Sequence, residues 1–119
     1  MKAPVFRGDV VRVRLDPGEG HEIRKTRPAV VLANNAACRF DSVVQVLPIT
    51  ALPDRPLRPY EAHIDPEPSG LTKPSRAVAN QIRTIAKRRI SKRLGCLSPA
   101  ELDGVDRAVA IQLGLRIRR

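Results

Sequence analysis

The most constraining feature of the sequence is a helix start signal near its C-terminal end. Ser98-Pro99-Ala100-Glu101 places serine at the N-cap, proline at the first helical position and glutamate three residues after the serine, which forms a capping box. Apolar residues follow at helical spacing: Leu102, Val105, Val109 and Leu113. Gly114 is suited to end the segment. The sequence therefore predicts one amphipathic helix that closes the chain.

Ahead of that helix, the chain has the pattern of short strands separated by loops rich in proline and glycine. Asp9–Leu15 alternates between apolar side chains and two arginines, Arg12 and Arg14, which predicts a half-buried strand with a basic outer surface. Further strands are predicted over Pro28–Asn34, Ser42–Thr50, Tyr60–Asp65 and Arg76–Ile85, with a helical turn around Ala36. Strands followed by one helix indicate a mainly antiparallel β-barrel closed by a C-terminal helix.

The charge balance narrows the class of partner. Lysine and arginine total 22 against 12 acidic residues, which gives a formal net charge of +10 and a pI near 11.0. A surface of that sign attracts polyanions, because each neutralised phosphate releases condensed counterions. The aromatic residues are Phe6, Phe40 and Tyr60, too few for a platform that stacks bases on several exposed rings.

Length, hydropathy and cysteine usage bound the remaining possibilities. At 119 residues the chain is expected to form one domain, 1–119. No stretch approaches the ~20 apolar residues that span a bilayer, and the N-terminus lacks the apolar run of a signal peptide, so a cytoplasmic protein without membrane contact is expected. Cys38 and Cys96 have no CxxC partner and no nearby histidine pair, which predicts reduced thiols and no metal site.

Several blocks of the chain resemble, in order and spacing, the MazF/PemK family of toxins. The first blocks are Arg7-Gly8-Asp9-Val10-Val11, Leu15-Asp16-Pro17, Gly20-His21-Glu22 and Thr26-Arg27-Pro28-Ala29-Val30-Val31-Leu32. The later blocks are Leu47-Pro48-Ile49-Thr50, Gln81-Ile82-Arg83-Thr84-Ile85 and the closing helix. The resemblance covers a core of about residues 7–115, which is nearly the whole chain.

The resemblance implies a CcdB/Kid/MazF-like fold, an SH3-like antiparallel barrel of five to seven strands with a C-terminal amphipathic helix. It also implies a homodimer that a cognate MazE-like antitoxin neutralises. The implied activity is sequence-specific cleavage of single-stranded RNA without metal or other cofactor, leaving 2′,3′-cyclic phosphate and 5′-hydroxyl ends. Two alternatives stay open because a shared fold does not fix function: a non-catalytic toxin of the gyrase-poison type and an RNA-binding module.

Three residues are candidates for catalysis. Arg27 carries a permanently charged donor fork that matches phosphate oxygens, although arginine is a poor general base. Thr50 matches the family position usually assigned to phosphate contact. Glu22 lies where the family often carries an acidic residue, and it can accept the 2′-hydroxyl proton or orient Arg27. His21 is the alternative base, since an unperturbed imidazole has a pKa of ~6.5.

A second group of residues is predicted to contact RNA or to assist the reaction. Asn80 and Gln81 are candidates for either role. Some relatives carry an Arg-x-Asp pair where this chain has Val78-Ala79-Asn80, and an asparagine cannot replace a carboxylate as a base. Candidates for RNA binding are Arg12, Arg14, Lys25 and Arg83. The rest of the basic run through Arg93 is expected to be a solvated face, with a diffuse contribution to RNA binding as the alternative. RNA specificity is expected from the loops Gly18–Thr26 and Ala51–Pro59.

Overall fold

The computed structural model describes residues 4–116 of the chain, and its described part contains seven strands and three α-helices. The strands are β1 (Asp9–Arg14), β2 (Thr26–Val31), β3 (Val43–Ala51), β4 (Glu61–Ile64), β5 (Ser75–Val78), β6 (Arg83–Ala86) and β7 (Ile90–Cys96). The helices are α1 (Asn35–Phe40), the short α2 (Pro66–Ser69) and α3 (Pro99–Leu113), with single 3-10 turns η1 (Ala79–Gln81) and η2 (Lys87–Arg89).

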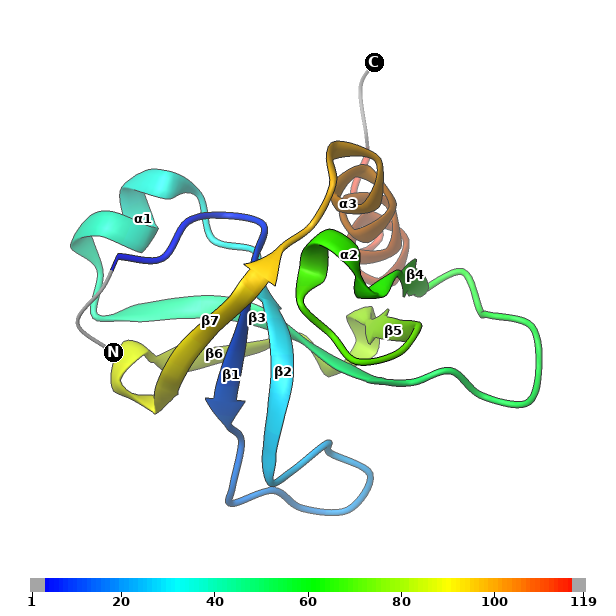
Figure 1. The fold of residues 1–119 in the computed structure, drawn as a ribbon, viewed down its shortest axis with the longest axis horizontal. Helices are drawn as coiled ribbons and strands as arrows, with labels where there is room; N and C mark the ends of the chain where they lie inside the picture. Colours follow the sequence, from blue (N-terminus) through cyan, green and yellow to red (C-terminus); the bar gives the residue numbers. More distant parts are fainter. Residues whose placement is uncertain (1–3, 117–119) are drawn as a thin grey trace.

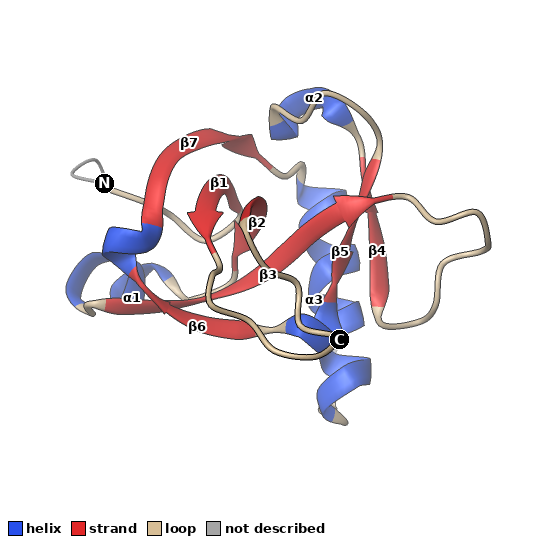
Figure 2. Ribbon diagram, turned by 90° about the horizontal axis from the view of Figure 1, so that it is seen from below, coloured by secondary structure: helices blue, strands red, loops and turns tan. Residues whose placement is uncertain are grey.

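All strand pairs are antiparallel, and they form one sheet in the order β4-β5-β3-β2-β1-β7, with β6 also paired to β3. Val46 of β3 pairs with Val31 of β2 and with Arg83 of β6, so these strands flank opposite edges of β3. Further along the same strand, Ile49 pairs with Ala77 of β5. The long β3 therefore ties the two halves of the curved sheet together, as Figure 2 shows. This confirms the predicted mainly antiparallel, barrel-like fold.

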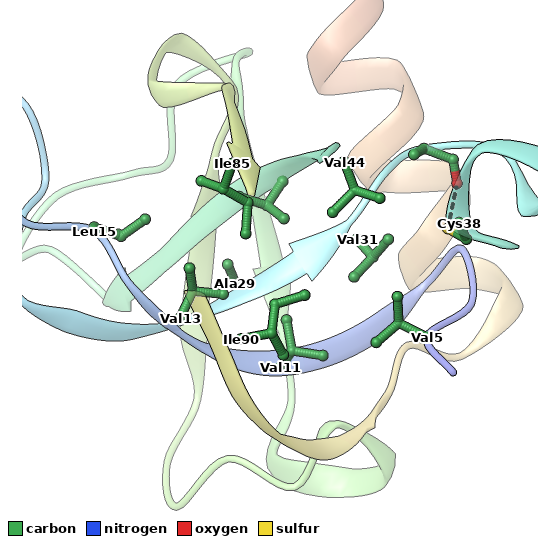
Figure 3. Close-up of a cluster of buried hydrophobic side chains, with 12 residues drawn as sticks. Val5, Val11, Val13, Leu15, Ala29, Val31, Cys38, Val44, Ile85 and Ile90 are labelled. Atoms are coloured by element: carbon green, nitrogen blue, oxygen red, sulfur yellow. Dashed lines mark hydrogen bonds between the residues drawn. The ribbon is translucent and has the colours of Figure 1, made fainter. Parts of the chain in front are cut away.

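The two faces of the central strands carry two separate cores. One face fills the inside of the barrel, and we call its cluster the barrel core (Figure 3): Val5, Val11, Val13, Leu15, Ala29, Val31, Ala33, Cys38, Val44, Val46, Ile85 and Ile90. The other face packs under α3, and we call its cluster the helix core: Val10, Val30, Leu47, Ile49, Ala62, Ile64, Ala77, Ala79, Leu97, Val105 and Ala108. The period-2 alternation of strands explains this division.

Helix α3 begins and ends as its sequence predicts. The Ser98 hydroxyl accepts from the Glu101 amide and the Glu101 carboxylate accepts from the Ser98 amide, which completes the capping box. Gly114 adopts a left-handed conformation with φ of 69°. Val105 is fully buried, but the apolar stripe runs out at the last turn, where Leu113 is 51% exposed. In the part of the chain that the structure describes, no helix is long and apolar enough to cross a membrane.

Two strand predictions need correction. The single strand expected over Arg76–Ile85 is two strands, β5 and β6, because the chain turns through η1 and pairs with different parts of β3. Strand β7 falls in the basic run that was expected to be a solvated face. Its register with β1 shifts between Val10 and Val11 and again between Arg12 and Val13, and these irregularities break the alternation by which a strand is recognised.

Candidate active site

The arginine and threonine of the candidate site lie at the rim of the barrel, on the face that carries the barrel core. Arg27 belongs to β2 and pairs with Val13 of β1, a fully buried residue of that core. Directly opposite residues in an antiparallel pair share a face, so Arg27 lies on the barrel-core side but at its exposed end. Its Nε donates to the Arg24 carbonyl at 3.2 Å, which leaves the other guanidinium nitrogens for a ligand.

The strand register brings Thr50 toward Arg27. Between β2 and β3, Ala29 pairs with Pro48 and Val31 with Val46. The β2–β3 pairing ends at Ala29 and Pro48, and Arg27 and Thr50 each lie two residues beyond that last pair. Thr50 also shares the face of Val46, four residues before it, because side chains alternate along a strand. Register and alternation therefore place the half-buried Thr50 hydroxyl and the exposed Arg27 guanidinium on the same face, at the same end of the barrel.

Arg83 joins the same rim from the other edge of β3. It pairs with Val46 and so lies on the barrel-core face. Its Nη1 donates to the Leu15 carbonyl at 2.6 Å, where β1 passes into the loop that leads to β2. Arg83 thus fixes the base of this loop and adds a second positive charge to the face that carries Arg27.

The β1–β2 loop, residues 15–25, carries the two candidate bases and is clamped by Gln81. The Gln81 amide nitrogen donates to the His21 carbonyl at 3.1 Å, and its amide oxygen accepts from the Ile23 backbone N–H at 3.0 Å. These two bonds hold the backbone on either side of Glu22. Both the Glu22 and His21 side chains are exposed, and the Glu22 carboxylate accepts from the Glu19 backbone N–H at 3.0 Å. Glu22 is therefore presented to solvent on a braced backbone.

Other contacts close the two ends of this loop against each other. The Leu15 backbone N–H donates to the Lys25 carbonyl, and the Lys25 N–H donates to the Asp16 carboxylate. Lys25 has φ of 72°, a left-handed conformation that turns the chain into β2. Arg89 donates to the carbonyls of Arg14 and Asp16. Part of the basic run that was expected to face only solvent therefore braces the loop.

The structure separates two of the predicted RNA contacts from this rim. Arg12 and Arg14 pair with Pro28 and Thr26 and project from the opposite face of the β1–β2 ribbon to Arg27. Lys25 and Asn80 are exposed, Lys25 in the loop and Asn80 in η1 next to Gln81. Across residues 4–116, no group of three or more His, Cys, Asp or Glu side chains is placed to hold a metal ion.

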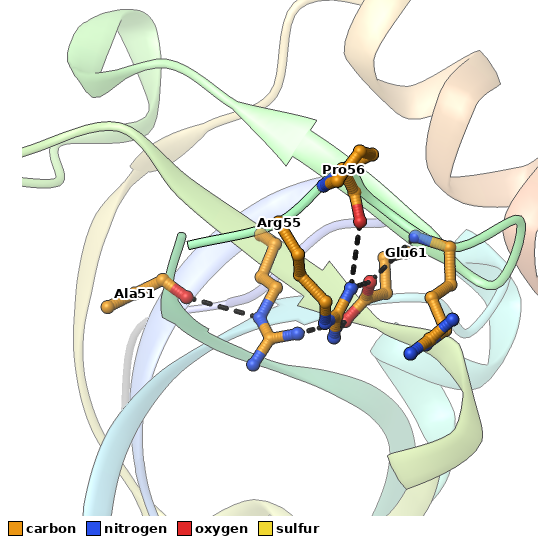
Figure 4. Close-up of polar contacts among 6 residues, drawn as sticks. Ala51, Arg55, Pro56 and Glu61 are labelled. Carbon is orange, nitrogen blue, oxygen red and sulfur yellow. Dashed lines mark hydrogen bonds and ion pairs between the residues drawn. The ribbon is translucent and has the colours of Figure 1, made fainter. Parts of the chain in front are cut away.

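A buried carboxylate near the same end of β3 as Thr50 was missed by the sequence reasoning. Glu61 begins β4, and its side chain is only 1% exposed. Arg55 donates to both of its oxygens at 2.8 and 3.1 Å, the Arg58 backbone N–H donates at 2.8 Å, and Arg76 forms a further ion pair (Figure 4). Arg76 also donates through Nε to the Ala51 carbonyl at 3.1 Å. The signal was an acidic residue among the arginines flanking a proline-rich loop.

The Gln81 clamp predicts a local effect. Replacing Gln81 by alanine removes both loop hydrogen bonds, each worth about 1 kcal/mol. We expect the Ile23 amide to exchange with solvent about tenfold faster in Gln81→Ala than in wild type. Hydrogen exchange measured by NMR checks this. The neighbouring variant Asn80→Ala is the control and should leave this exchange rate unchanged. Equal rates in Gln81→Ala and wild type would contradict the clamp.

The buried Glu61 predicts a pH dependence of stability. Hydrogen bonds from Arg55 and Arg58 and the charge of Arg76 lower the pKa of Glu61 from 4.5 to about 2, although burial opposes the shift. Because the pKa is lower in the folded state, this contribution is complete above about pH 4.5 and is lost as pH falls toward 2. Urea unfolding should show a loss of about 2 kcal/mol from this group between about pH 6 and pH 3. Glu61→Gln should flatten that part of the profile, and an unchanged slope would contradict it.

Comparison with known proteins places this architecture among toxins. The fold and rim define a small, basic, MazF-like barrel closed by a C-terminal helix. Residues 6–113 match the sequence profile of the PemK-like, MazF-like toxins of type II toxin–antitoxin systems. The endoribonuclease MazF9 of Mycobacterium tuberculosis is 34% identical over 114 residues, which cover 92% of this chain and 96% of that protein. The chain belongs to the PemK/MazF toxin family.

Solved structures support the same assignment. An endoribonuclease in complex with its cognate antitoxin, from a mycobacterial species, is 27% identical with a TM-score of 0.77, covering 96% of this chain and 99% of that one. MazF from Deinococcus radiodurans has a TM-score of 0.81 at 24% identity, covering 96% of this chain and 100% of that one, and shows the fold alone. The predicted family and fold are confirmed, and the roles of individual site residues stay predictions.

Proposed function

We propose that this chain is the toxin of a toxin–antitoxin pair and cuts single-stranded RNA as a sequence-specific, metal-independent endoribonuclease. Its membership of the PemK/MazF family and its likeness to endoribonucleases over nearly the full length support the activity. The single observation that carries the proposal is the rim. Arg27, Thr50 and Arg83 project from one face beside the loop that presents Glu22.

The chemistry needs little beyond positioning and charge, because RNA carries its own nucleophile. The 2′-oxygen attacks the neighbouring phosphorus, the bond from phosphorus to the 5′-oxygen breaks, and a 2′,3′-cyclic phosphate and a 5′-hydroxyl result. Arg27 is suited to stabilise the extra negative charge on the phosphoryl oxygens, since its guanidinium has donors to spare. Thr50 offers a hydroxyl to the same phosphate, and Arg83 adds charge from the far edge of β3.

The proton of the 2′-hydroxyl needs an acceptor. Glu22 and His21 are both exposed on the clamped loop and are the two candidates for this role. A bound RNA would remove water from this part of the rim, which leaves these two side chains as the proton acceptors nearest the substrate. The bracing of the loop by Gln81 then fixes where either base can meet the substrate.

The remaining features of the proposal concern assembly and location. We propose one domain over 1–119 that forms a homodimer in the cytoplasm and is neutralised by a MazE-like antitoxin. The exposed apolar residues at the end of α3 and just beyond it support a dimer, with Ile111 51%, Leu113 51% and Leu115 59% exposed. The solved complex of a mycobacterial relative with its antitoxin supports the partner. The net charge of +10 favours an acidic antitoxin segment and RNA phosphate alike.

The test is incubation of the purified protein with a long single-stranded RNA in excess EDTA. Discrete fragments are expected, and sequencing of their ends should give a short common motif. If the RNA stays uncut in the presence of folded, antitoxin-free protein, the proposed nuclease activity is wrong. If such RNA were bound in a salt-sensitive way, the protein would be an RNA-binding module instead.

A further inference from the structure

We propose that Glu61, Arg55 and Arg76 form a positioning cluster that fixes the 52–60 loop beside Thr50 and thereby sets which nucleotides next to the cut are accepted. The inference rests on the proposed function and deepens it. It concerns a buried ion cluster that the reaction described above does not use.

The cluster contacts the backbone next to Thr50 through Arg76. Thr50 pairs directly with Arg76 across β3 and β5, so the two side chains share a face. Arg76 donates to the carbonyl of Ala51, the residue that follows Thr50, and is itself held by Glu61. Thr50 thus pairs with Arg76 on one edge of β3, and on the other edge it lies two residues beyond the last pair with β2, the strand that carries Arg27. A shift of Arg76 would therefore move the backbone next to the candidate phosphate contact.

The cluster also holds the 52–60 loop. Residues 52–60 have no regular secondary structure and project away from the sheet (Figures 1 and 2). Glu61 accepts from the Arg55 side chain and from the Arg58 backbone N–H, so two points of the loop are tied to one carboxylate. Pro53, Pro56 and Pro59 further restrict its backbone. The loop therefore has a defined shape that depends on a carboxylate buried at its base.

The cluster is positively charged, and its two arginines are partly exposed. Two arginines surround one carboxylate, so the cluster carries a net charge of +1. The Arg55 side chain keeps 33% of its surface exposed and that of Arg76 20%, while Glu61 is covered. A buried carboxylate that orders two arginines presents their remaining donors at fixed positions. An RNA strand that leaves the rim past Thr50 would meet this ordered, positive wall, which suits a role in selecting nucleotides next to the cut.

The experiment compares Arg55→Ala with Arg58→Ala. Both variants remove one positive charge from the same loop, but the Glu61 carboxylate bonds the Arg55 side chain and only the backbone of Arg58. Hydrogen exchange of the amides in residues 54–58 reports loop order. Cleavage of a randomised single-stranded RNA pool reports which sequences are cut, and kcat and KM are measured on one preferred RNA. The same measurements on Glu61→Gln test the carboxylate, because this variant removes the negative charge that holds both arginines.

We expect Arg55→Ala to loosen the loop, to broaden the set of sequences cut, and to lower kcat/KM about tenfold beyond the effect of Arg58→Ala. The same sequence preference in both variants would overturn the proposal, even if the loop exchanged faster in Arg55→Ala, because the cluster would then be structural only. Failure of the proposed function is a distinct result, since it appears as uncut RNA with the wild-type protein.

Discussion

Arg27→Ala is expected to reduce RNA cleavage by a factor of about 10²–10³ while the protein stays folded. Arg27 is exposed at the barrel rim, and within the described residues its one side-chain hydrogen bond goes to the Arg24 carbonyl, so loss of the side chain costs little stability. Removing a preorganised donor to a phosphoryl oxygen in the transition state has an effect of this size. Single-turnover cleavage rates in EDTA, measured beside far-ultraviolet circular dichroism, check both halves of the expectation.

The control for Arg27→Ala must lose the same charge elsewhere. Arg107 is exposed on α3, away from the rim, and Arg107→Ala should change the rate by less than about threefold through long-range electrostatics alone. Arg27→Lys is informative as well, because lysine keeps the charge but loses the planar fork. An Arg27→Ala protein that cuts RNA as fast as Arg107→Ala would remove Arg27 from the reaction.

The largest effect on stability is expected from Gly70→Ala. Gly70 ends α2 with φ of 79°, and a Cβ at this position would overlap the backbone carbonyl of Leu94 in β7. From the other side, a Cβ on Gly95 would overlap the backbone of Pro68 and Ser69. In both cases the overlapping atoms belong to the backbone and not to a flexible side chain that could move away. Relief requires α2 and β7 to separate, so we expect a loss of about 2–4 kcal/mol in the free energy of unfolding.

Gly104→Ala provides the matched control for this prediction. Gly104 lies inside α3, and a Cβ there would meet no atom within 4 Å apart from its chain neighbours and the backbone of its own helix. Alanine should therefore stabilise the protein by about 0.5–1 kcal/mol, the ordinary helical preference over glycine. Urea unfolding of the two variants should shift the midpoints in opposite directions. A Gly70→Ala midpoint equal to that of wild type would show that α2 and β7 do not pack this closely.

The C-terminal half of the fold shows where local sequence signals suffice and where they fail. Helix α3 was predicted from its capping box because the signal lies within four consecutive residues. Strand β7 was not, because its register with β1 shifts twice and two of its three exposed positions, Lys92 and Arg93, are charged. The break between β5 and β6 depends on pairing with different parts of β3, which is non-local information.

In the candidate site, too, some residues could be found from the sequence, whereas their arrangement depends on strand pairing. Family resemblance pointed to Arg27, Thr50 and Glu22, but their common rim depends on the register of β1, β2 and β3. Arg12 and Arg14 were grouped with the other RNA contacts, although pairing places them on the opposite face from Arg27. Gln81 was expected to act on RNA, yet both of its polar atoms hold the β1–β2 loop. Glu61 was overlooked because its three partners, the side chains of Arg55 and Arg76 and the backbone N–H of Arg58, come together only in the folded chain.

In the proposed reaction, the protein cuts RNA through the substrate's own 2′-hydroxyl. The most direct measurement uses a preferred RNA in which one nucleotide, immediately 5′ of the cut, lacks that hydroxyl. In excess EDTA, the wild-type protein should cut the all-RNA strand to a 2′,3′-cyclic phosphate and leave the single-deoxy strand intact at that position. Cleavage of the single-deoxy strand at the same position would contradict the account, because the nucleophile would then have to come from water or the protein.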